Sequence, residues 1–405
     1  MSLWLVVLST LLSLSTTGFG RCLWSELEQS AQENGSPLTL TYVDHLTIED
    51  MADEVPAILG TAQNGVHRYL MTYQSENIDG EATPASGLLL IPDTCKPSYP
   101  VISFQHGTLI HNEEIPSIKM KAGLAEAGKG YLVIAQDYLG FGASKDLLHP
   151  YSIPLGYQNS GLHMLKALKT MSVANEVELN PLFLKGYSEG GFASLAMQKA
   201  IEGGQLPDYD LRGVSAAGSY YDLVTTGAAL IAMEGADLVY LGNFITAYSH
   251  YYRDGQMDRY IQKKFRDLDF FDLYNGDYTY NEVRDVLPSS PQELMPLWYR
   301  TQYLAKAYLI SNHWKIDLIL DKVEKNIKAN SLHKGWSPRT PTRIYHCQDD
   351  DIVPALASDI AYDSLKELSD AVELIKIESP GGGVVFKHST CPAKHTPVLF
   401  FDKLL

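Results

Sequence analysis

Short apolar runs alternate with segments of helical spacing over much of this 405-residue chain. Two runs, residues 67–71 and 86–91, are separated by turn residues at Asp79-Gly80, which predicts a β-hairpin that opens the folded domain. The later runs lack the alternation of a half-exposed strand, as expected for parallel strands covered on both faces. These runs are residues 101–104, 132–135, 182–184, 211–216, 344–346 and 372–377.

Segments of helical spacing lie between these runs. They are residues 119–129, 157–170, 192–201 and 354–368, with an apolar segment 398–405 at the C-terminal end. Strands that alternate with helices predict a three-layer α/β domain, in which a mostly parallel central sheet is flanked by helices.

The alternation stops between Gly218 and Pro341, where aromatic-rich sequence of helical spacing takes its place. We interpret residues 219–341 as an inserted helical cap, which divides the core into residues 21–218 and 342–405. Aromatic side chains at helical spacing are also typical of ordinary core helices, so helices packed directly on the sheet are the alternative. The aromatic residues are Tyr240, Phe244, Tyr248, Tyr251, Tyr252, Tyr260, Phe270, Phe271, Tyr274, Trp298, Tyr299 and Tyr303.

The composition is that of an ordinary globular protein, with 45% hydrophobic residues. The chain carries 32 basic and 48 acidic residues, a formal net charge of −16. A negative chain gives no electrostatic support for a nucleic-acid partner or for binding to an anionic membrane surface. We expect neither as a partner.

The first 20 residues have the order of a secretory signal peptide: an apolar stretch around residues 3–14, small polar residues, and Gly18-Phe19-Gly20 before the expected cleavage point. No Lys or Arg precedes the apolar stretch, so a short membrane anchor is the alternative. No later segment approaches the length of a membrane span. We expect a secreted or periplasmic protein without stable membrane insertion after cleavage.

An even number of cysteines in an exported chain favours disulfides over inert buried thiols. The spacings of the four match neither a structural zinc site nor a redox C-x-x-C motif, so we expect no bound metal. They are Cys22, Cys95, Cys347 and Cys391.

The sequence Gly-Tyr-Ser-Glu-Gly-Gly at residues 186–191 lies directly between the apolar run 182–184 and the helical segment 192–201. A serine on a tight strand-to-helix turn takes a strained backbone conformation, and the residues two before and two after it must be small for the turn to close. Gly186 and Gly190 meet this demand. The context predicts a nucleophile elbow at Ser188 rather than an ordinary N-cap serine.

A serine hydroxyl is a poor nucleophile at neutral pH, so Ser188 needs a base, and the base needs an acid that fixes its tautomer. Chain order Ser, Asp, His is one known order of such a triad. The acid is expected on a loop between a strand and a helix, and three successive aspartates lie in such a loop. We favour Asp350 over Asp349 and Asp351. An acidic surface loop or a cation site is the alternative for this run.

The base is expected after the last strand, where glycines at 381–383 lead to His388, with His395 seven residues later. We favour His388, because it lies in the loop before the terminal helix and can fold back over the strand ends. His395 precedes Thr396-Pro397, where a helix would begin, so we expect a local cap or a surface contact from it. Either histidine alone would more often be structural than catalytic.

Acyl transfer also requires hydrogen-bond donors for the developing oxyanion. The N–H of Glu189, directly after the nucleophile, is one candidate. The loop after the strand 101–104 offers the other, because His106-Gly107-Thr108 has a glycine where the backbone must approach the substrate. We favour the N–H of Thr108, with a plain turn at His-Gly as the alternative.

The triad also predicts a disulfide. Cys347 lies three residues before Asp350, and Cys391 lies three residues after His388. The triad would therefore bring the two cysteine loops together. Cys22 and Cys95 remain as the other possible pair.

These motifs, taken in order from about Tyr69 to the C-terminus, resemble those of secreted α/β-hydrolases of the secretory-lipase type. The resemblance implies an α/β-hydrolase fold, esterase or lipase activity without a cofactor, and a helical cap after the sixth core strand. It also implies that the loop 137–142 shapes one side of the active site. Gln136 stands where relatives often carry proline. The motifs are Phe104-Gln105-His106-Gly107, Asp137-Tyr138-Leu139-Gly140-Phe141-Gly142, Gly186-Tyr187-Ser188-Glu189-Gly190-Gly191, Asp350-Asp351-Ile352-Val353-Pro354 and a late histidine.

The sequence thus predicts a serine-dependent carboxylic-ester hydrolase that acts on a small-molecule ester or lipid. The aromatic cap would form the pocket for an acyl or aryl group. A serine peptidase or amidase on the same triad is the alternative among enzymes. A non-catalytic protein that binds a ligand on a hydrolase scaffold is the alternative outside them.

Overall fold

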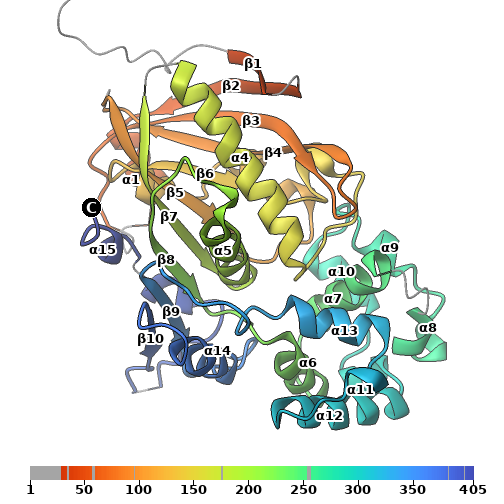
Figure 1. The fold of residues 1–405 in the computed structure, drawn as a ribbon. Coiled ribbons are helices and arrows are strands. Elements are labelled where there is room, and N and C mark those ends of the chain that lie inside the picture. The colour runs from red at the N-terminus through yellow and green to blue at the C-terminus, as the bar shows by residue number, and fades with distance from the viewer. Residues whose placement is uncertain are drawn as a thin grey trace, which may run out of the picture.

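The computed structural model describes residues 29–33, 36–56, 60–94, 96–174, 177–252, 257–381, 383–395 and 397–405. The predicted signal peptide and the cysteines at 22 and 95 lie outside these residues. The described chain forms a ten-stranded sheet in the order β1-β2-β3-β4-β6-β5-β7-β8-β9-β10 (Figure 1). The strands are β1 Gln29–Glu33, β2 Ser36–Leu46, β3 Val66–Glu76, β4 Ala82–Pro92, β5 Ser98–Gln105, β6 Leu132–Gln136, β7 Glu178–Tyr187, β8 Leu211–Ala217, β9 Thr342–Cys347 and β10 Val372–Ile377.

The sheet has an antiparallel part and a parallel part. Neighbouring strands from β1 to β4, and β4 with β6, pair antiparallel. The strands from β6 through β5, β7, β8 and β9 to β10 pair parallel. The predicted parallel sheet is confirmed, and so is the hairpin, which is β3 and β4.

The expectation that this hairpin opens the domain is wrong, because β1 and β2 precede it in the sheet. Leu38 and Leu40 on β2 are buried and alternate with threonines along the strand. This alternation is the pattern of a strand with one buried face, and it was visible in the sequence.

The central strands are buried on both faces, as their continuous apolar runs predicted. On β6, Ile134 belongs to one apolar cluster and Val133 to the other. On β7, Leu184 and Phe183 divide in the same way. Two hydrophobic layers therefore hold the sheet between helices.

Helices cover the two faces of the sheet in different sets. One cluster includes side chains of α4, α5 and α14, and the other includes side chains of α1, α3 and α15. In Figure 1, α4 and α5 lie in front of the strands. The bounds are α1 Ile48–Glu54, α2 Pro116–Lys119, α3 Leu124–Ala127, α4 Pro154–Ala174, α5 Glu189–Ala200, α14 Leu356–Lys366 and α15 Pro397–Phe401.

The single crossover helix expected over residues 119–129 is replaced by two short helices, α2 and α3. Met120 takes a left-handed conformation, and so does Gly123 with φ 83°. A Cβ on Gly123 would lie 2.4 Å from Cγ1 of Val133, so the chain passes directly against β6 at this point. The close approach explains the break in the helix.

In the described part of the chain, eight α-helices lie between β8 and β9, in the segment predicted to be a cap. Figure 1 shows them grouped at the lower right, to one side of the sheet. None of the helices in the described chain is long and apolar enough to cross a membrane. The bounds are α6 Leu223–Ala232, α7 Leu238–Tyr251, α8 Met257–Tyr260, α9 Phe270–Leu273, α10 Tyr280–Val286, α11 Pro291–Leu294, α12 Leu297–Ser311 and α13 Lys322–Asn330.

Side-chain caps explain where several of these helices begin. The carboxylate of Asp222 accepts hydrogen bonds from two backbone amides of the first turn of α6, and Asp237 caps α7. Capping boxes start α10 at Thr279 and α13 at Asp321. Each cap satisfies amides that have no partner inside the helix, and is worth about 1 kcal/mol.

Candidate active site

Ser188 stands on the sharp turn between β7 and α5, with φ 58° and ψ −126°. A Cβ on Gly186 would lie 2.0 Å from the carbonyl oxygen of Gly190. A Cβ on Gly190 would lie 2.1 Å from the carbonyl oxygen of Gln105. Both positions therefore require glycine for the turn to close, which is the steric argument made from the sequence.

Three of the predicted residues come together at this turn. Nε2 of His388 lies 2.9 Å from Oγ of Ser188, and Nδ1 of His388 lies 2.7 Å from Oδ2 of Asp350. Asp350 follows β9, and His388 precedes α15. With the proton on Nδ1 donated to the carboxylate, Nε2 is left to accept the proton of the serine hydroxyl.

The carboxylate of Asp350 has no exposed surface. Its Oδ1 accepts hydrogen bonds from the amides of Ile352 and Val353, at 3.0 and 2.9 Å. Burial acts to raise the pKa of Asp350, but hydrogen bonds from His346 and His388 outweigh it and hold that pKa well below the ordinary value. The carboxylate therefore stays ionised and can orient His388.

His346 was missed in the sequence, where it was only the last residue of a predicted strand. Its Nε2 lies 3.4 Å from Oδ2 of Asp350 and 3.0 Å from the carbonyl oxygen of Val353. Its Nδ1 lies 2.6 Å from the hydroxyl of Ser358 on α14. His346 and His388 thus both contact Oδ2 of this carboxylate.

The two neighbouring aspartates hold the segment that carries His388. Oδ1 of Asp351 accepts a hydrogen bond from the backbone amide of His388 at 3.1 Å. Asp349 accepts a hydrogen bond from the hydroxyl of Ser379, which in turn accepts one from the amide of Phe386 at 2.8 Å. The three aspartates therefore have three different contacts, and the one nearest the imidazole is Asp350.

His388 is also held by Tyr187, the residue before Ser188. The hydroxyl of Tyr187 donates a hydrogen bond to the carbonyl oxygen of His388 at 2.9 Å. The two rings lie with their centroids 5.0 Å apart. Burial raises the pKa of Tyr187, so its hydroxyl keeps its proton and remains a donor.

His395 lies elsewhere. Its Nε2 is 2.5 Å from the hydroxyl of Ser215 on β8, and only 5% of the residue is exposed. Burial, aided by the charge of Lys185, holds the pKa of His395 well below the ordinary value. The expectation of a cap or surface contact is wrong, because the imidazole is part of the core.

The two residues with predicted oxyanion donors lie on either side of Ser188. Glu189 is the first residue of α5, and Thr108 lies in the loop after β5. Neither amide donates a hydrogen bond to another residue in the described chain. Nδ1 of His106 lies 2.7 Å from the carbonyl oxygen of Gly107, and in a trans peptide this contact turns the N–H of Thr108 the opposite way.

The glycine at 107 is not demanded by packing. A Cβ there would lie 3.5 Å from the carbonyl oxygen of Tyr187 and 3.7 Å from Cβ of Ser188, which are ordinary contact distances. No contact within the described chain therefore requires glycine at this position.

The predicted disulfide between Cys347 and Cys391 is confirmed. It joins the end of β9, just before the aspartates, to the segment that follows His388. Cys22 and Cys95, the other possible pair, lie outside the described residues.

We expect the double replacement Cys347→Ala/Cys391→Ala to lower the free energy of unfolding by about 2–4 kcal/mol, because the bridge closes a 44-residue separation. Turnover should fall by about tenfold, because the base is then held less firmly. Urea unfolding and steady-state kinetics measure both. Unchanged midpoint and turnover would show that the bridge supports neither.

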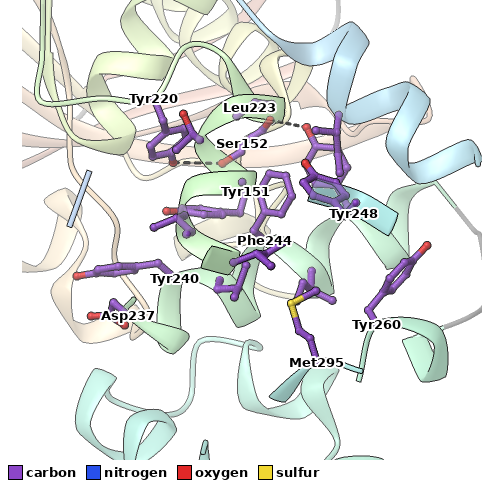
Figure 2. Close-up of a pocket in the computed structure, with 18 of the residues that line it drawn as sticks. Tyr151, Ser152, Tyr220, Leu223, Asp237, Tyr240, Phe244, Tyr248, Tyr260 and Met295 are labelled. Atoms are coloured by element: carbon purple, nitrogen blue, oxygen red, sulfur yellow. Dashed lines mark hydrogen bonds between the residues drawn. The ribbon is translucent and has the colours of Figure 1, made fainter. Parts of the chain in front are cut away.

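A pocket is lined by Ser188 and Thr108 together with residues of the helices between β8 and β9. Figure 2 shows part of this lining. It encloses about 950 Å³ of empty space, counting the part open to solvent. Its lining is mainly apolar and aromatic, with Tyr151 and Phe244 near the centre of the view. The hydroxyl of Ser152 donates a hydrogen bond to the hydroxyl of Tyr220 at 3.1 Å, and the hydroxyl of Tyr248 donates one to the carbonyl oxygen of Ser152 at 3.0 Å. The pocket suits an apolar group attached to an atom that reacts at Ser188.

Within the described chain, one group of side chains has ligand atoms close enough to share a metal ion. It consists of His45 on β2, His67 on β3 and Asp93 after β4, whose ligand atoms lie within 4.8 Å of one another. The imidazoles stack with centroids 4.3 Å apart and an interplanar angle of 24°. Because the two imidazole rings are nearly parallel, their nitrogen lone pairs do not converge on one ion. In the sheet, three strands separate β3 from β7, the strand that leads to Ser188. The group takes no part in the site at Ser188.

No protein-family model matches this chain, and no curated protein matches it. Solved structures are similar to it. A candidate hydrolase from Legionella pneumophila has a TM-score of 0.78 at 24% identity, covering 90% of this chain and 97% of the other. The rice cell wall degrading esterase LipA from Xanthomonas oryzae has a TM-score of 0.78 at 21% identity, covering 91% and 98%. Candida antarctica lipase A in its closed state has a TM-score of 0.61 at 16% identity, covering 90% and 81%. The predicted α/β-hydrolase fold is confirmed.

Proposed function

We propose that this protein is a secreted serine hydrolase that cleaves carboxylic esters through an acyl-enzyme. The observation that carries the proposal is the continuous set of contacts from Ser188 through His388 to Asp350, at 2.9 and 2.7 Å. Nucleophile, base and acid each have the partner that their role requires.

In this mechanism Oγ of Ser188 attacks the ester carbonyl, and Nε2 of His388 takes the hydroxyl proton. The N–H groups of Thr108 and Glu189 donate hydrogen bonds to the oxyanion. His388 then gives its proton to the leaving alcohol oxygen as the C–O bond breaks. A water molecule, activated by the same imidazole, releases the acid and restores Ser188. No step requires a cofactor or a metal ion.

The apolar pocket beside Ser188 supports an ester with an apolar acyl or aryl group, in a small molecule or a lipid. The similar structures include an esterase and a lipase. The helices between β8 and β9 would then act as the cap. The disulfide supports an oxidising location, secreted or periplasmic.

The direct test is a panel of nitrophenyl esters of increasing acyl length, compared with aminoacyl anilides. We expect hydrolysis of the esters and little or none of the anilides. Cleavage of anilides at a similar kcat/KM would favour a peptidase or amidase on the same triad. Failure to cleave any ester, with folded protein, would favour a binding protein.

The pocket gives a further prediction. Leu230 on α6 lines the pocket, and Leu230→Trp should lower kcat/KM for long acyl chains by about 10- to 100-fold, because the indole fills the space that the chain needs. The acetyl ester should be cleaved within about threefold of the wild-type rate. Val173→Trp, on the exposed side of α4, is the matched control. An equal loss of kcat/KM for all esters would mean that the acyl group binds outside this pocket.

A further inference from the structure

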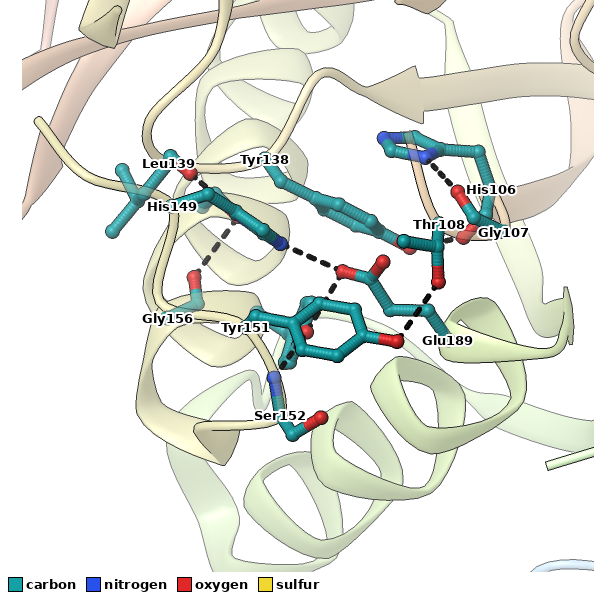
Figure 3. A network of polar contacts seen from close by, with 12 residues as sticks. His106, Gly107, Thr108, Tyr138, Leu139, His149, Tyr151, Ser152, Gly156 and Glu189 are labelled. Carbon is teal, nitrogen blue, oxygen red and sulfur yellow. Dashed lines mark hydrogen bonds and ion pairs between the residues drawn. The ribbon is translucent and has the colours of Figure 1, made fainter. Parts of the chain in front are cut away.

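The buried side chains of Glu189 and His149 contact each other (Figure 3), and the mechanism above uses neither of these side chains. The side chains of Glu189 and His149 are 1% and 3% exposed. Nε2 of His149 lies 2.8 Å from Oε1 of Glu189, which also accepts a hydrogen bond from the hydroxyl of Tyr157 at 2.8 Å. Because Glu189 directly follows Ser188, any charge on this carboxylate lies close to the reacting atoms.

The contacts of His149 fix the charge of the pair. Nδ1 lies 2.7 Å from the carbonyl oxygen of Leu139, which can only accept, so Nδ1 carries a proton. A second proton must lie between Nε2 and Oε1 of Glu189. On Nε2 it gives an imidazolium and a carboxylate, and on Oε1 it gives a neutral imidazole and a carboxylic acid. Either way the net charge of the pair is zero.

The Glu189–His149 pair lies in an apolar environment, where a net charge would be costly. Aromatic rings enclose His149, with the ring of Tyr138 nearly parallel to it and those of Tyr151 and Tyr157 edge-on, at centroid distances of 5.8, 6.0 and 6.0 Å. Oε2 of Glu189 is buried and has no hydrogen-bond partner in the described chain. A carboxylate without a compensating charge would be poorly solvated here, and its field would reach the site with little screening.

The same loop contacts both residues whose amides are proposed to donate hydrogen bonds to the oxyanion. His149 contacts Glu189, and two residues later the hydroxyl of Tyr151 lies 3.0 Å from Oγ1 of Thr108 (Figure 3). The loop can pack here because Gly140 has φ 88°, and a Cβ on it would lie 2.4 Å from Cα of His149. The segment 137–142, singled out in the sequence, thereby supports His149.

We propose that Glu189 and His149 form a positioning pair for ester hydrolysis, in which His149 cancels the charge of a carboxylate that would otherwise oppose the developing oxyanion. The inference rests on the proposed function. The carboxylate fixes the first turn of α5, so that the N–H of Glu189 faces the oxyanion, and the histidine removes the electrostatic cost of having it there.

Charge and structure are separated by a double-mutant cycle of His149→Gln, Glu189→Gln and the double variant. His149→Gln keeps a donor to Glu189 but leaves its charge uncompensated. We expect kcat to fall by about 10- to 100-fold, and the acid limb of kcat/KM against pH to move up by about 1 unit, because a nearby negative charge favours the protonated form of the base. In the double variant, which has no carboxylate, that limb should return and kcat should recover to within about threefold of Glu189→Gln.

Other titratable groups near the pair do not add a step of their own to the profile of kcat/KM against pH. Burial lowers the pKa of His106 and raises the pKa values of the nearby tyrosines, so these groups stay neutral near pH 7. The tyrosines are Tyr138, Tyr151, Tyr157 and Tyr220. Asp350, Asp351, Lys387 and Tyr187, which face His388, are the same in every variant.

The control is His163→Gln on α4, whose imidazole lies 3.2 Å from the hydroxyl of Ser75 and should leave kcat and the profile unchanged. A double variant as slow as His149→Gln, or a His149→Gln profile without the shift, would overturn the proposal in favour of a structural role. If His149→Gln does not fold, folding of the double variant supports the charge argument and failure of both overturns it. Ser188→Ala in the same assay separately tests the proposed function.

Discussion

Ser188→Ala is expected to lower kcat for ester hydrolysis by about 10⁴-fold or more and to leave the protein folded. In the proposed mechanism the hydroxyl of Ser188 forms the bond to the acyl carbon, and no other side chain in the described chain has the same contact with His388. Residual turnover would come only from the oxyanion donors and from binding.

The fold should survive because the substitution removes one part-buried hydrogen bond and keeps the backbone of the elbow. Ser172→Ala is the matched control, since Ser172 is a buried serine on α4 whose hydroxyl donates to the carbonyl oxygen of Lys169. It should retain normal turnover. If Ser188→Ala keeps more than about a tenth of wild-type turnover in a clean preparation, Ser188 is not the nucleophile.

The second large effect separates the two late histidines. His388→Ala should lower kcat by about 10⁴-fold with little change in stability, because the imidazole that transfers the proton is lost. His395→Ala should keep turnover per folded molecule within a few-fold but lower the free energy of unfolding by about 1–3 kcal/mol, because it leaves the buried hydroxyl of Ser215 without its partner.

Two measurements on both variants decide which histidine is the base. The first is kcat at a saturating ester concentration, and the second is the free energy of unfolding in urea. The reverse result, with loss of turnover on replacing His395 and near-normal turnover on replacing His388, would exchange the two assignments. If both variants lose stability but keep their turnover, neither histidine is the base.

Parts of the site could be predicted from the sequence because the chemistry of short motifs determines them. The elbow requires glycine on both sides of Ser188, and a triad in this chain order leaves few candidates for the acid and the base. The bridge between Cys347 and Cys391 followed from the same reasoning. In each case, a short segment carried the whole signal.

Other parts depend on contacts between segments far apart in the chain. The carboxylate of Glu189 meets His149 across 40 residues. His346 lies only four residues before Asp350, and the two side chains meet because the chain turns directly after β9. A lone histidine in a loop or at a strand end has no local pattern that distinguishes such a role. The burial of His395 against Ser215 was hidden for the same reason.

The most direct measurement is covalent labelling of the folded protein by a fluorophosphonate, followed by mass spectrometry of its peptides. We expect one phosphonyl group per chain, on Ser188, with the rate of labelling strongly reduced in His388→Ala. Absence of labelling in folded wild-type protein, or labelling at another residue with Ser188 unmodified, would contradict an acyl-enzyme mechanism at this site.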